Sequence, residues 1–205
     1  MSDIYALFRH SLAGLRVLVA ATLLVGVAYP LAVYGVAAVA APWQAHGSLV
    51  TATGAHTTDA SEAVGSVVLG QLVEGDLAGD LFRPRPSAAG DGYDPLSTSG
   101  SNLGPESPEL VAAIRQRRAE VAAREGVEPA QVPPDAVTAS ASGLDPDISP
   151  AYAELQVPRV ARATGLAEEQ VRRLVAEHTS DRTWGVLGEP RVDVLELNLA
   201  VLAGS

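Results

Sequence analysis

The sequence predicts an α+β domain outside the cytoplasm, tethered to a membrane by one N-terminal helix. Two observations predict this arrangement. An uncharged run of 25 residues, 17–41, follows Arg9 and Arg16 near the start of the 205-residue chain. The remaining sequence mixes short stretches rich in Val, Leu and Thr with amphipathic stretches of helical spacing, which is typical of a domain with both helices and strands.

The uncharged run is long enough to cross a bilayer. At a rise of about 1.5 Å per residue it reaches roughly 37 Å, whereas the hydrocarbon core is about 30 Å thick. A cleaved signal peptide is the alternative, but the apolar region of a signal peptide has only about 7 to 15 residues. Here the uncharged sequence continues until Asp59, well past that length. A bilayer tolerates Pro30 in mid-span through local adjustment or neighbouring helices. We therefore expect a retained anchor over residues 12–41.

Charge predicts the orientation of this anchor. Arg9 and Arg16 flank its N-terminal end, and no further Lys or Arg occurs until Arg83. By the positive-inside rule, residues 1–11 stay in the cytoplasm and residues 42–205 form the outer body.

Composition limits what the outer body can do. Without Asp3, Arg9 and Arg16, 23 acidic and 12 basic residues remain, a formal charge of −11. Such a surface repels nucleic acid, so no nucleic-acid partner is expected. The chain has no cysteine, and all 14 of its basic residues are arginine. These absences exclude thiolate chemistry, a Schiff-base lysine and a P-loop lysine, so the chain is a poor candidate for hydrolysing ATP itself.

The first part of the body predicts two short strands and a long loop. Residues 48–53 and 63–73 are rich in Val, Leu and Thr, and we expect two strands with a turn between them. Residues 82–108 contain five prolines and four glycines, which excludes regular structure. A loop of this length inside a compact domain is usually functional or disordered.

We expect this loop to be ordered, because four apolar side chains can attach it to a core. They are Phe82, Tyr93, Leu96 and Leu103. Asn102 suits a turn or a left-handed backbone position.

A helix is predicted after the loop. Ser107 suits the N-cap, Pro108 the first helical position, and Gly126 the end. Between them Leu110, Ile114, Arg117 and Val121 follow at helical spacing. The same helix carries Arg115, Arg117, Arg118 and Arg124 with Glu120 and Glu125 interleaved, which favours a solvated face over a phosphate site.

Two more helices are expected near the C-terminus, after a loop at residues 132–149. The first starts at Ser149, is interrupted at Pro158 and stops at Gly165. The second places Val171, Leu174, Val175 and His178 on one face, with His178 at its end. Together they make a helical hairpin.

The pattern of the last segment, residues 191–201, leaves two alternatives open. Val192 and Val194 alternate with polar residues, and Leu195, Leu197 and Leu199 then alternate in the opposite phase. A strand therefore needs a bulge between the two sets. A short helix capped by Asp193 is the competing interpretation, and either one is buried core.

Catalytic motifs are missing from the sequence. It has no G-x-S-x-G, H-E-x-x-H, G-x-x-x-x-G-K or G-x-G-x-x-G, and no spacing pairs two carboxylates for acid–base work. His46 and His56 have no third ligand at a usable spacing, so no metal site is expected. Composition and pattern alone therefore support only a membrane-tethered acidic domain.

Six segments taken together resemble the C subunit of the Kdp potassium-transporting ATPase, in order from the anchor to the last residues. They are FRPRPSA at 82–88, GYDPL at 92–96, GSNLGP at 100–105, VTASASGLDP at 137–146, QVPRVA at 156–161 and GEPRVDVLELNL at 188–199. The chain departs from the family pattern at Pro84, where the family usually has Gly, and at Asp94, where it usually has Asn. It also reads Ser-Gly-Ser-Asn at 99–102 in place of Gly-Gly-Ser-Asn.

The resemblance implies a non-catalytic subunit of a bacterial plasma-membrane complex. Its implied partners are a potassium-binding channel-like subunit, a P-type ATPase subunit that carries the phosphorylated aspartate, and a small single-span subunit. The family is described as a catalytic chaperone that raises the ATP affinity of the ATPase subunit, so ATP is a possible ligand and Gln156 a candidate contact for it. We expect Arg85, Ser101, Asn102, Leu103 and Gln156 to contact partner chains.

From this resemblance we expect a subunit that supports pump assembly and shapes potassium entry from outside. A tethered sensor or ligand-binding domain unconnected to a pump is the alternative, and a direct nucleotide-binding module is a third. The acidic body would raise the local cation concentration, within the roughly 8 Å that salt screening allows.

Overall fold

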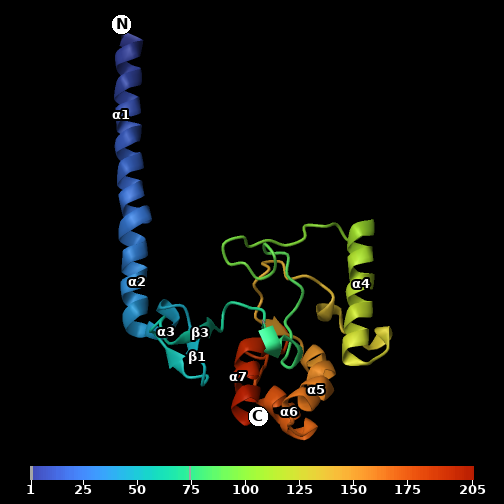
Figure 1. Cartoon of the computed structure of the whole chain (residues 1–205). Helices are drawn as coiled ribbons and strands as arrows, with labels where there is room; N and C mark the ends of the chain where they lie inside the picture. The colour runs from blue at the N-terminus through green and yellow to red at the C-terminus, as the bar shows by residue number, and fades with distance from the viewer. Residues whose placement is uncertain (1, 74) are drawn as a thin grey trace. The chain divides into compact units, whose positions relative to one another are not determined.

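The computed structural model describes residues 2–73 and 75–205. The chain divides into two compact units, Met1–Gly47 and Ser48–Ser205, and Figure 1 labels their elements.

A single helical rod makes up most of the first unit. It runs through α1 (Ser2–Leu23), a π-helical segment η1 (Leu24–Ala28) and α2 (Tyr29–Ala40), and the short helix α3 (Pro42–Ala45) follows. Pro30 lacks an N–H and its ring crowds the carbonyl four residues earlier, so a widened turn before it lets the helix continue. The local adjustment expected at Pro30 is confirmed.

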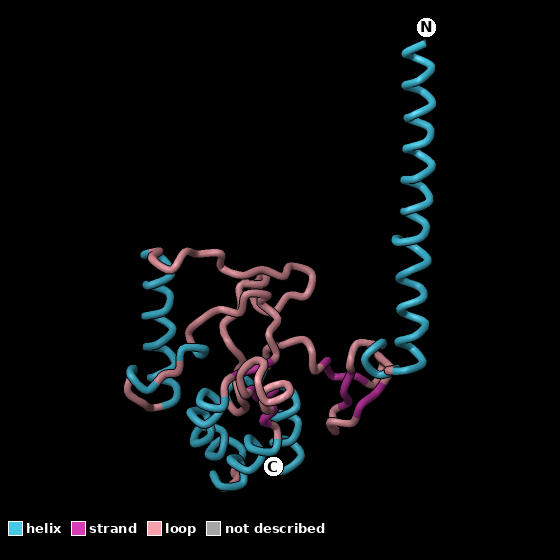
Figure 2. The backbone as a smooth tube through the Cα atoms, turned by 180° about the vertical axis from the view of Figure 1, so that it is seen from behind, coloured by secondary structure: helices cyan, strands magenta, loops and turns pink. Residues whose placement is uncertain are grey.

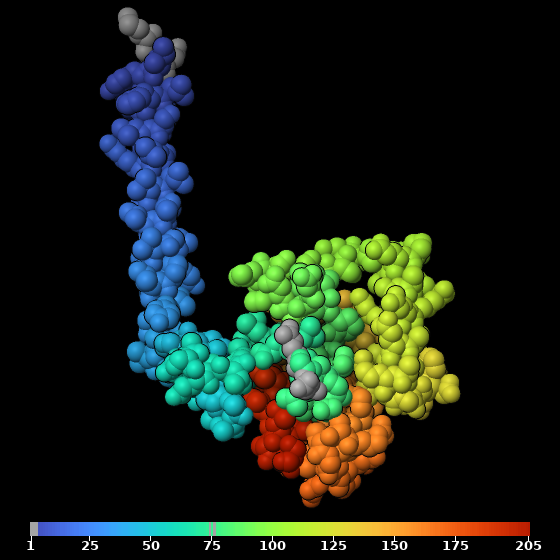
Figure 3. Space-filling view, viewed as in Figure 1, coloured from blue at the N-terminus to red at the C-terminus, as the bar shows by residue number. Residues whose placement is uncertain are grey.

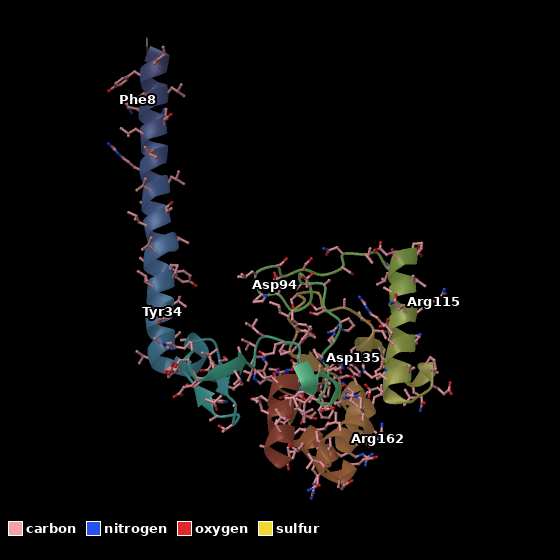
Figure 4. All side chains as sticks on the ribbon, viewed as in Figure 1. Phe8, Tyr34, Asp94, Arg115, Asp135 and Arg162 are labelled. Atoms are coloured by element: carbon pink, nitrogen blue, oxygen red, sulfur yellow. The ribbon has the colours of Figure 1, made fainter. Side chains whose placement is uncertain are left out.

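The described part of the chain has one helix long and apolar enough to cross a membrane. This helix covers Ile4–Ala40, 37 residues with a mean hydropathy of 2.1. Its apolar side chains point outward on every side, as Phe8 and Tyr34 do in Figure 4. A helix that is apolar all round suits a lipid environment or the interior of a large protein.

The second unit begins with a small antiparallel sheet. Its strands are β1 (Leu49–Thr51), β2 (His56–Thr57) and β3 (Ala63–Ser66), in the order β2-β1-β3. The strand expected at residues 48–53 is confirmed. The second expected strand ends at Ser66 instead of continuing to residue 73, and β2 was not predicted because two residues carry no alternation.

A second antiparallel sheet joins segments far apart in the sequence. Its strands are β4 (Asp147–Ile148), β5 (Thr179–Ser180) and β6 (Arg191–Asp193), in the order β4-β6-β5. Val192 of the central strand is opposite Ile148 on one side and Thr179 on the other. Val192 is fully buried, so this sheet fixes where the C-terminal segment enters the core.

Helix α4 (Pro108–Glu125) has the boundaries that its sequence predicts. The Ser107 side chain accepts a hydrogen bond from the Leu110 N–H at 3.4 Å, and Gly126 ends the helix with φ of 71°. A left-handed residue of this kind is most easily a glycine. Short 3₁₀ turns lie before and after it, at Gly75–Gly79, Pro129–Gln131 and Pro134–Ala136. The second of these turns ends just before the expected loop at residues 132–149, and the third lies inside it.

Helices α5 (Pro150–Thr164) and α6 (Glu168–Glu177) form the expected hairpin. Arg172 of α6 joins them through an ion pair with Glu154 at 2.8 Å, and His178 caps the end of α6. The interruption expected at Pro158 is wrong, because α5 continues through it. Pro158 has no N–H, so the carbonyl of the exposed Glu154, four residues earlier, lacks its helical donor. The burial of Tyr152, Val157 and Val160 stabilises the helix in spite of this loss.

The tail combines the two alternatives for residues 191–201. Arg191–Asp193 is strand β6, and Val194–Gly204 is helix α7. Asp193 caps this helix, since its Oδ1 accepts the Glu196 N–H at 2.8 Å. Leu197 and Val201 of α7 are fully buried, so the prediction of buried core is confirmed.

A large core holds most of the second unit together. It gathers fully buried side chains from the long loop, from α5 and α6, from β6 and from α7. The residues with no exposed surface include Phe82, Val157, Val160, Val171, Val192, Leu197 and Val201.

Candidate functional site

The long loop at residues 82–107 contains no helix or strand (Figure 2). Buried contacts nevertheless hold it in place. Phe82 has no exposed surface, and its main chain is held by one buried amide. Asn198 of α7 accepts the Phe82 N–H at 2.8 Å and donates to the Phe82 carbonyl at 2.9 Å. A side-chain amide thus replaces the strand partner that the extended segment lacks.

The next residue of the loop is held in the same way. Gln156 of α5 accepts the Arg83 N–H at 2.8 Å through Oε1 and donates from Nε2 to the Arg83 carbonyl at 3.2 Å. Its Oε1 also accepts from Arg159 Nη2 at 2.9 Å. Gln156 has no exposed surface, so its side chain holds the loop and does not face solvent.

Ser87 and Tyr93 close the first half of the loop. The Ser87 hydroxyl donates to the Gly143 carbonyl at 2.8 Å and accepts the Tyr93 N–H at 3.0 Å. The Tyr93 hydroxyl donates to the Arg85 carbonyl at 2.8 Å. Burial, and then the Asp145 carboxylate, raise the pKa of Tyr93 well above its ordinary value, so the phenol stays protonated as this donor.

A cavity of about 320 Å³ lies between this loop and α4; Figure 3 shows the loop in green beside α4 in yellow. Four arginines line it, Arg83 and Arg85 from the loop and Arg117 and Arg124 from α4. We call it the arginine cavity. Phe82, Tyr93 and Tyr152 supply its aromatic walls.

Two of the four guanidinium groups are paired with carboxylates. Arg85 Nη1 lies 2.7 Å from Asp145 Oδ2, and Arg124 Nε lies 2.7 Å from Glu125 Oε1. Arg124 also donates to the Tyr152 hydroxyl at 3.1 Å. Burial raises the pKa of Tyr152 and the Arg124 charge opposes that shift, so at neutral pH this hydroxyl is an uncharged acceptor.

Arg83 and Arg117 meet only main-chain carbonyls among the described residues. Arg83 Nη2 donates to Ala78 at 2.8 Å and Arg117 Nη1 to Val137 at 3.2 Å. The Nε atoms of Arg83 and Arg85 are buried without a partner. Burial, followed by the charges of Arg124 and Arg159, lowers the pKa of Arg83.

Behind the cavity, Glu125 neutralises two arginines. Its side chain has no exposed surface and bonds Arg124 and, from α5, Arg159 Nε at 3.0 Å. Arg159 Nη1 also donates to the carbonyls of Gly79 and Leu81. The solvated face expected for this basic run is therefore wrong at its C-terminal end. At the other end Arg115 is exposed and points away from the body (Figure 4).

A family model described as "K+-transporting ATPase, c chain", KdpC, matches residues 11–203. The chain belongs to the KdpC family.

Its relatives carry the same name and nearly the same length. A protein named potassium-transporting ATPase KdpC subunit from Kineococcus radiotolerans is 51% identical over 195 residues, which cover 95% of this chain and 94% of the relative. The protein of that name from Variovorax paradoxus is 52% identical over 183 residues, covering 89% and 90%. That from Mycobacterium bovis is 45% identical and covers 94% and 97%. The resemblance to the Kdp C subunit is thereby confirmed.

The structure separates the site residues suggested by the KdpC resemblance into two groups. Arg85 lines the arginine cavity and Gln156 anchors the residue two places before it. Ser101 and Asn102 are exposed further along the loop, and Leu103 is half-buried. Asn102 has the left-handed backbone expected of it, with φ of 51°. Leu96 is 96% exposed, so it is not one of the loop's attachment points.

Sequence reasoning missed an exposed apolar loop between β5 and β6. Trp184, Val186 and Leu187 are 86%, 72% and 54% exposed. Main-chain hydrogen bonds between Thr183 and Leu187 close the loop in both directions. Trp184 has a positive φ of 55°, which is rare for a bulky residue. The only signal for it in the sequence is a tryptophan followed by glycine in a polar stretch.

Proposed function

We propose that this KdpC-family chain is a non-catalytic accessory subunit of a potassium-transporting P-type ATPase, and that it supports assembly and activity of the pump. The match of the family model over residues 11–203 carries this proposal. The relatives are named as subunits of a potassium-transporting ATPase, and the helix Ile4–Ala40 is long and apolar enough to cross a membrane.

The proposed placement is single-pass in the bacterial plasma membrane. Residues 1–11 would be cytoplasmic, residues 12–41 would span the bilayer, and residues 42–205 would lie outside. Arg9 and Arg16 before the span, with no further basic residue until Arg83, support this orientation through the positive-inside rule.

A non-catalytic role agrees with the chemistry of the arginine cavity. Guanidinium groups stay protonated in proteins and cannot serve as general bases. The two carboxylates that line the cavity, Asp91 and Glu120, are exposed. The cavity is therefore suited to holding charge and not to transferring protons.

The proposed partner surface is the loop at residues 82–108. Ser101 and Asn102 present exposed polar groups, and Leu103 offers partly buried apolar surface beside them. Gln156 would act indirectly by fixing the loop at Arg83. The partners proposed from the family are the channel-like potassium-binding subunit, the ATPase subunit and the small single-span subunit.

The chaperone role described for the family fits an indirect mechanism here. We propose that any rise in the ATP affinity of the ATPase subunit passes through the assembled complex. Gln156 is buried, and its amide bonds the main chain of Arg83. The proposed orientation also places the body away from cytoplasmic ATP.

Truncation tests the proposal directly. Cells that depend on this pump would express residues 1–43 alone in place of the full chain, with membrane insertion checked by immunoblot. We expect high-affinity potassium uptake to be lost, and normal uptake would defeat the proposal. In a mild-detergent pull-down, the full chain should bring large membrane subunits with it; a tethered sensor unconnected to a pump would purify alone.

A further inference from the structure

The arginine cavity holds more positive charge than its own carboxylates neutralise. Asp145 pairs with Arg85, and Glu125 pairs with Arg124. Glu125 also bonds Arg159, so one buried carboxylate serves two guanidinium groups. Among the described residues, Arg83 and Arg117 form no ion pair, which leaves two half-buried charges at the cavity.

The two uncompensated arginines also keep unused donors. A guanidinium group has five N–H donors, whereas within the described part of the chain Arg83 and Arg117 each make a single side-chain bond, to a main-chain carbonyl. The Nε atoms of Arg83 and Arg85 are buried without an acceptor. A buried donor left unsatisfied costs about 1–3 kcal/mol, so an acceptor-rich ligand would be stabilising here.

The carboxylates that line the cavity are at its exposed rim, where they repel a bound anion only weakly. Asp91 and Glu120 are exposed, and Gln116 already donates to Glu120 at 2.8 Å. Exposed charges are screened by water and salt, while half-buried guanidinium groups act at short range in a less polar medium. The charges of the described residues that line the cavity therefore favour an anion, although the whole body is acidic.

Size and shape restrict the ligand further. A volume of about 320 Å³ is at the lower end of small-molecule sites. Planar guanidinium forks match the tetrahedral oxygens of phosphate in bidentate geometry. Tyr93, Tyr152 and Phe82 leave apolar wall for a small substituent on that group.

We propose that the arginine cavity binds a phosphate group, held by Arg83 and Arg117. The group belongs either to a small soluble phosphate or to the headgroup of a phospholipid.

Isothermal titration calorimetry on the full chain in a neutral detergent tests this at constant ionic strength. The probes are inorganic phosphate, glycerol 3-phosphate and short-chain phosphatidylglycerol. Saturable binding of the first two assigns a soluble phosphate, and binding of phosphatidylglycerol alone assigns a lipid headgroup. Absence of saturable binding of all three would overturn the proposal.

Variants locate the site. Arg83→Gln with Arg117→Gln should weaken binding by roughly ten- to a hundredfold for each guanidinium removed, because each supplies charge-assisted bonds. Arg162→Gln is the matched control, since Arg162 is exposed on α5 (Figure 4), and it should bind as the unmodified chain does. Unchanged affinity in the double variant would overturn the assignment.

Two further variants separate binding from folding. Arg117→Gln alone keeps the Arg83 bond to Ala78, and its far-ultraviolet circular dichroism should match the unmodified chain while binding weakens. Glu120→Gln removes a screened negative charge at the rim and should tighten binding by no more than about twofold. A Glu120→Gln variant that binds more weakly would contradict a positive cavity whose ligand is an anion.

Discussion

The side-chain amide of Gln156 pairs with both main-chain polar groups of Arg83, across 73 positions of sequence. This bond pair ties α5 to the start of the long loop, next to the matching pair between Asn198 and Phe82. The loop therefore depends on two buried amides for its position.

Replacing Gln156 by leucine should lower the free energy of unfolding of the second unit, mainly through lost hydrogen bonds and not through lost packing. The substitution leaves the Arg83 N–H and carbonyl without partners, at about 1–3 kcal/mol for each buried group. Urea unfolding of the full chain in detergent, followed by circular dichroism, measures the change. Gln116→Leu is the control, because the exposed Gln116 side chain bonds the exposed Glu120. Equal effects of the two variants would show that the bonds between Gln156 and Arg83 contribute little.

Glu125→Ala should be among the most destabilising single changes in the chain. It removes the carboxylate between Arg124 and Arg159 and leaves uncompensated buried charge, at about 3–5 kcal/mol. Glu154→Ala breaks the exposed pair with Arg172 and should cost about 1 kcal/mol or less. The difference in free energy of unfolding between the two variants tests the distinction, and a ratio near one would refute it.

Alanine substitutions at two glycines with similar backbone angles can distinguish the steric cost of an added Cβ from the cost of a left-handed backbone. Gly143 and Gly126 have φ of 75° and 71°. A Cβ on Gly143 would lie 2.5 Å from the Ala89 Cβ and 2.8 Å from the Ser99 carbonyl oxygen, whereas one on Gly126 meets open space. Gly126→Ala should cost about 1–2 kcal/mol and Gly143→Ala an additional 1–3 kcal/mol from overpacking. Thermal unfolding of both variants would detect the difference; equal melting temperatures would mean that the loop yields freely around Gly143.

Asp193 should make stability depend on pH. Burial chiefly, together with Glu196 and Asp147, raises the pKa of Asp193 from 3.8 to about 7. The folded chain then holds a proton that the unfolded chain releases, so this contribution is complete below about pH 4 and is lost as the pH rises to about 7. Asn keeps the N-cap and does not titrate.

Unfolding of the unmodified chain and of Asp193→Asn at several pH values tests this sign. The free energy of unfolding of the unmodified chain, minus that of the variant, should fall between about pH 4 and pH 7 and stay level above. A difference that rises over this interval would contradict it. Burial also raises the pKa of Asp147. Because Asp147 is present in both proteins, its contribution largely cancels in this difference.

The parts of this fold that the sequence predicts are those set by local signals. Ser107, Pro108 and Gly126 bound α4 because caps act within one helical turn, and Asn102 adopts its left-handed backbone for a similarly local reason. The strands β2, β4 and β5 have two residues each, too few to show alternation, so only their long-range pairing defines them.

The candidate site could be predicted only in part. The prolines and glycines of residues 82–108 indicate a loop, and its apolar side chains indicate that the loop is ordered. Arg85 and Gln156 are candidates because of the resemblance to the Kdp C subunit. Burial of Glu125 could not be foreseen, since interleaved charges on a helix usually face water. Glu125 is buried because Arg159 of α5 pairs with it, and the sequence of α4 alone gives no sign of this partner.

The chain has two tryptophans, and they fall in different compact units: Trp43 in the first and the exposed Trp184 in the second. Each unit thus carries its own intrinsic fluorophore. With Trp43 replaced by phenylalanine, the remaining tryptophan emission would come from Trp184 alone, on one surface loop. A shift in its emission wavelength would therefore show that another molecule has covered this loop.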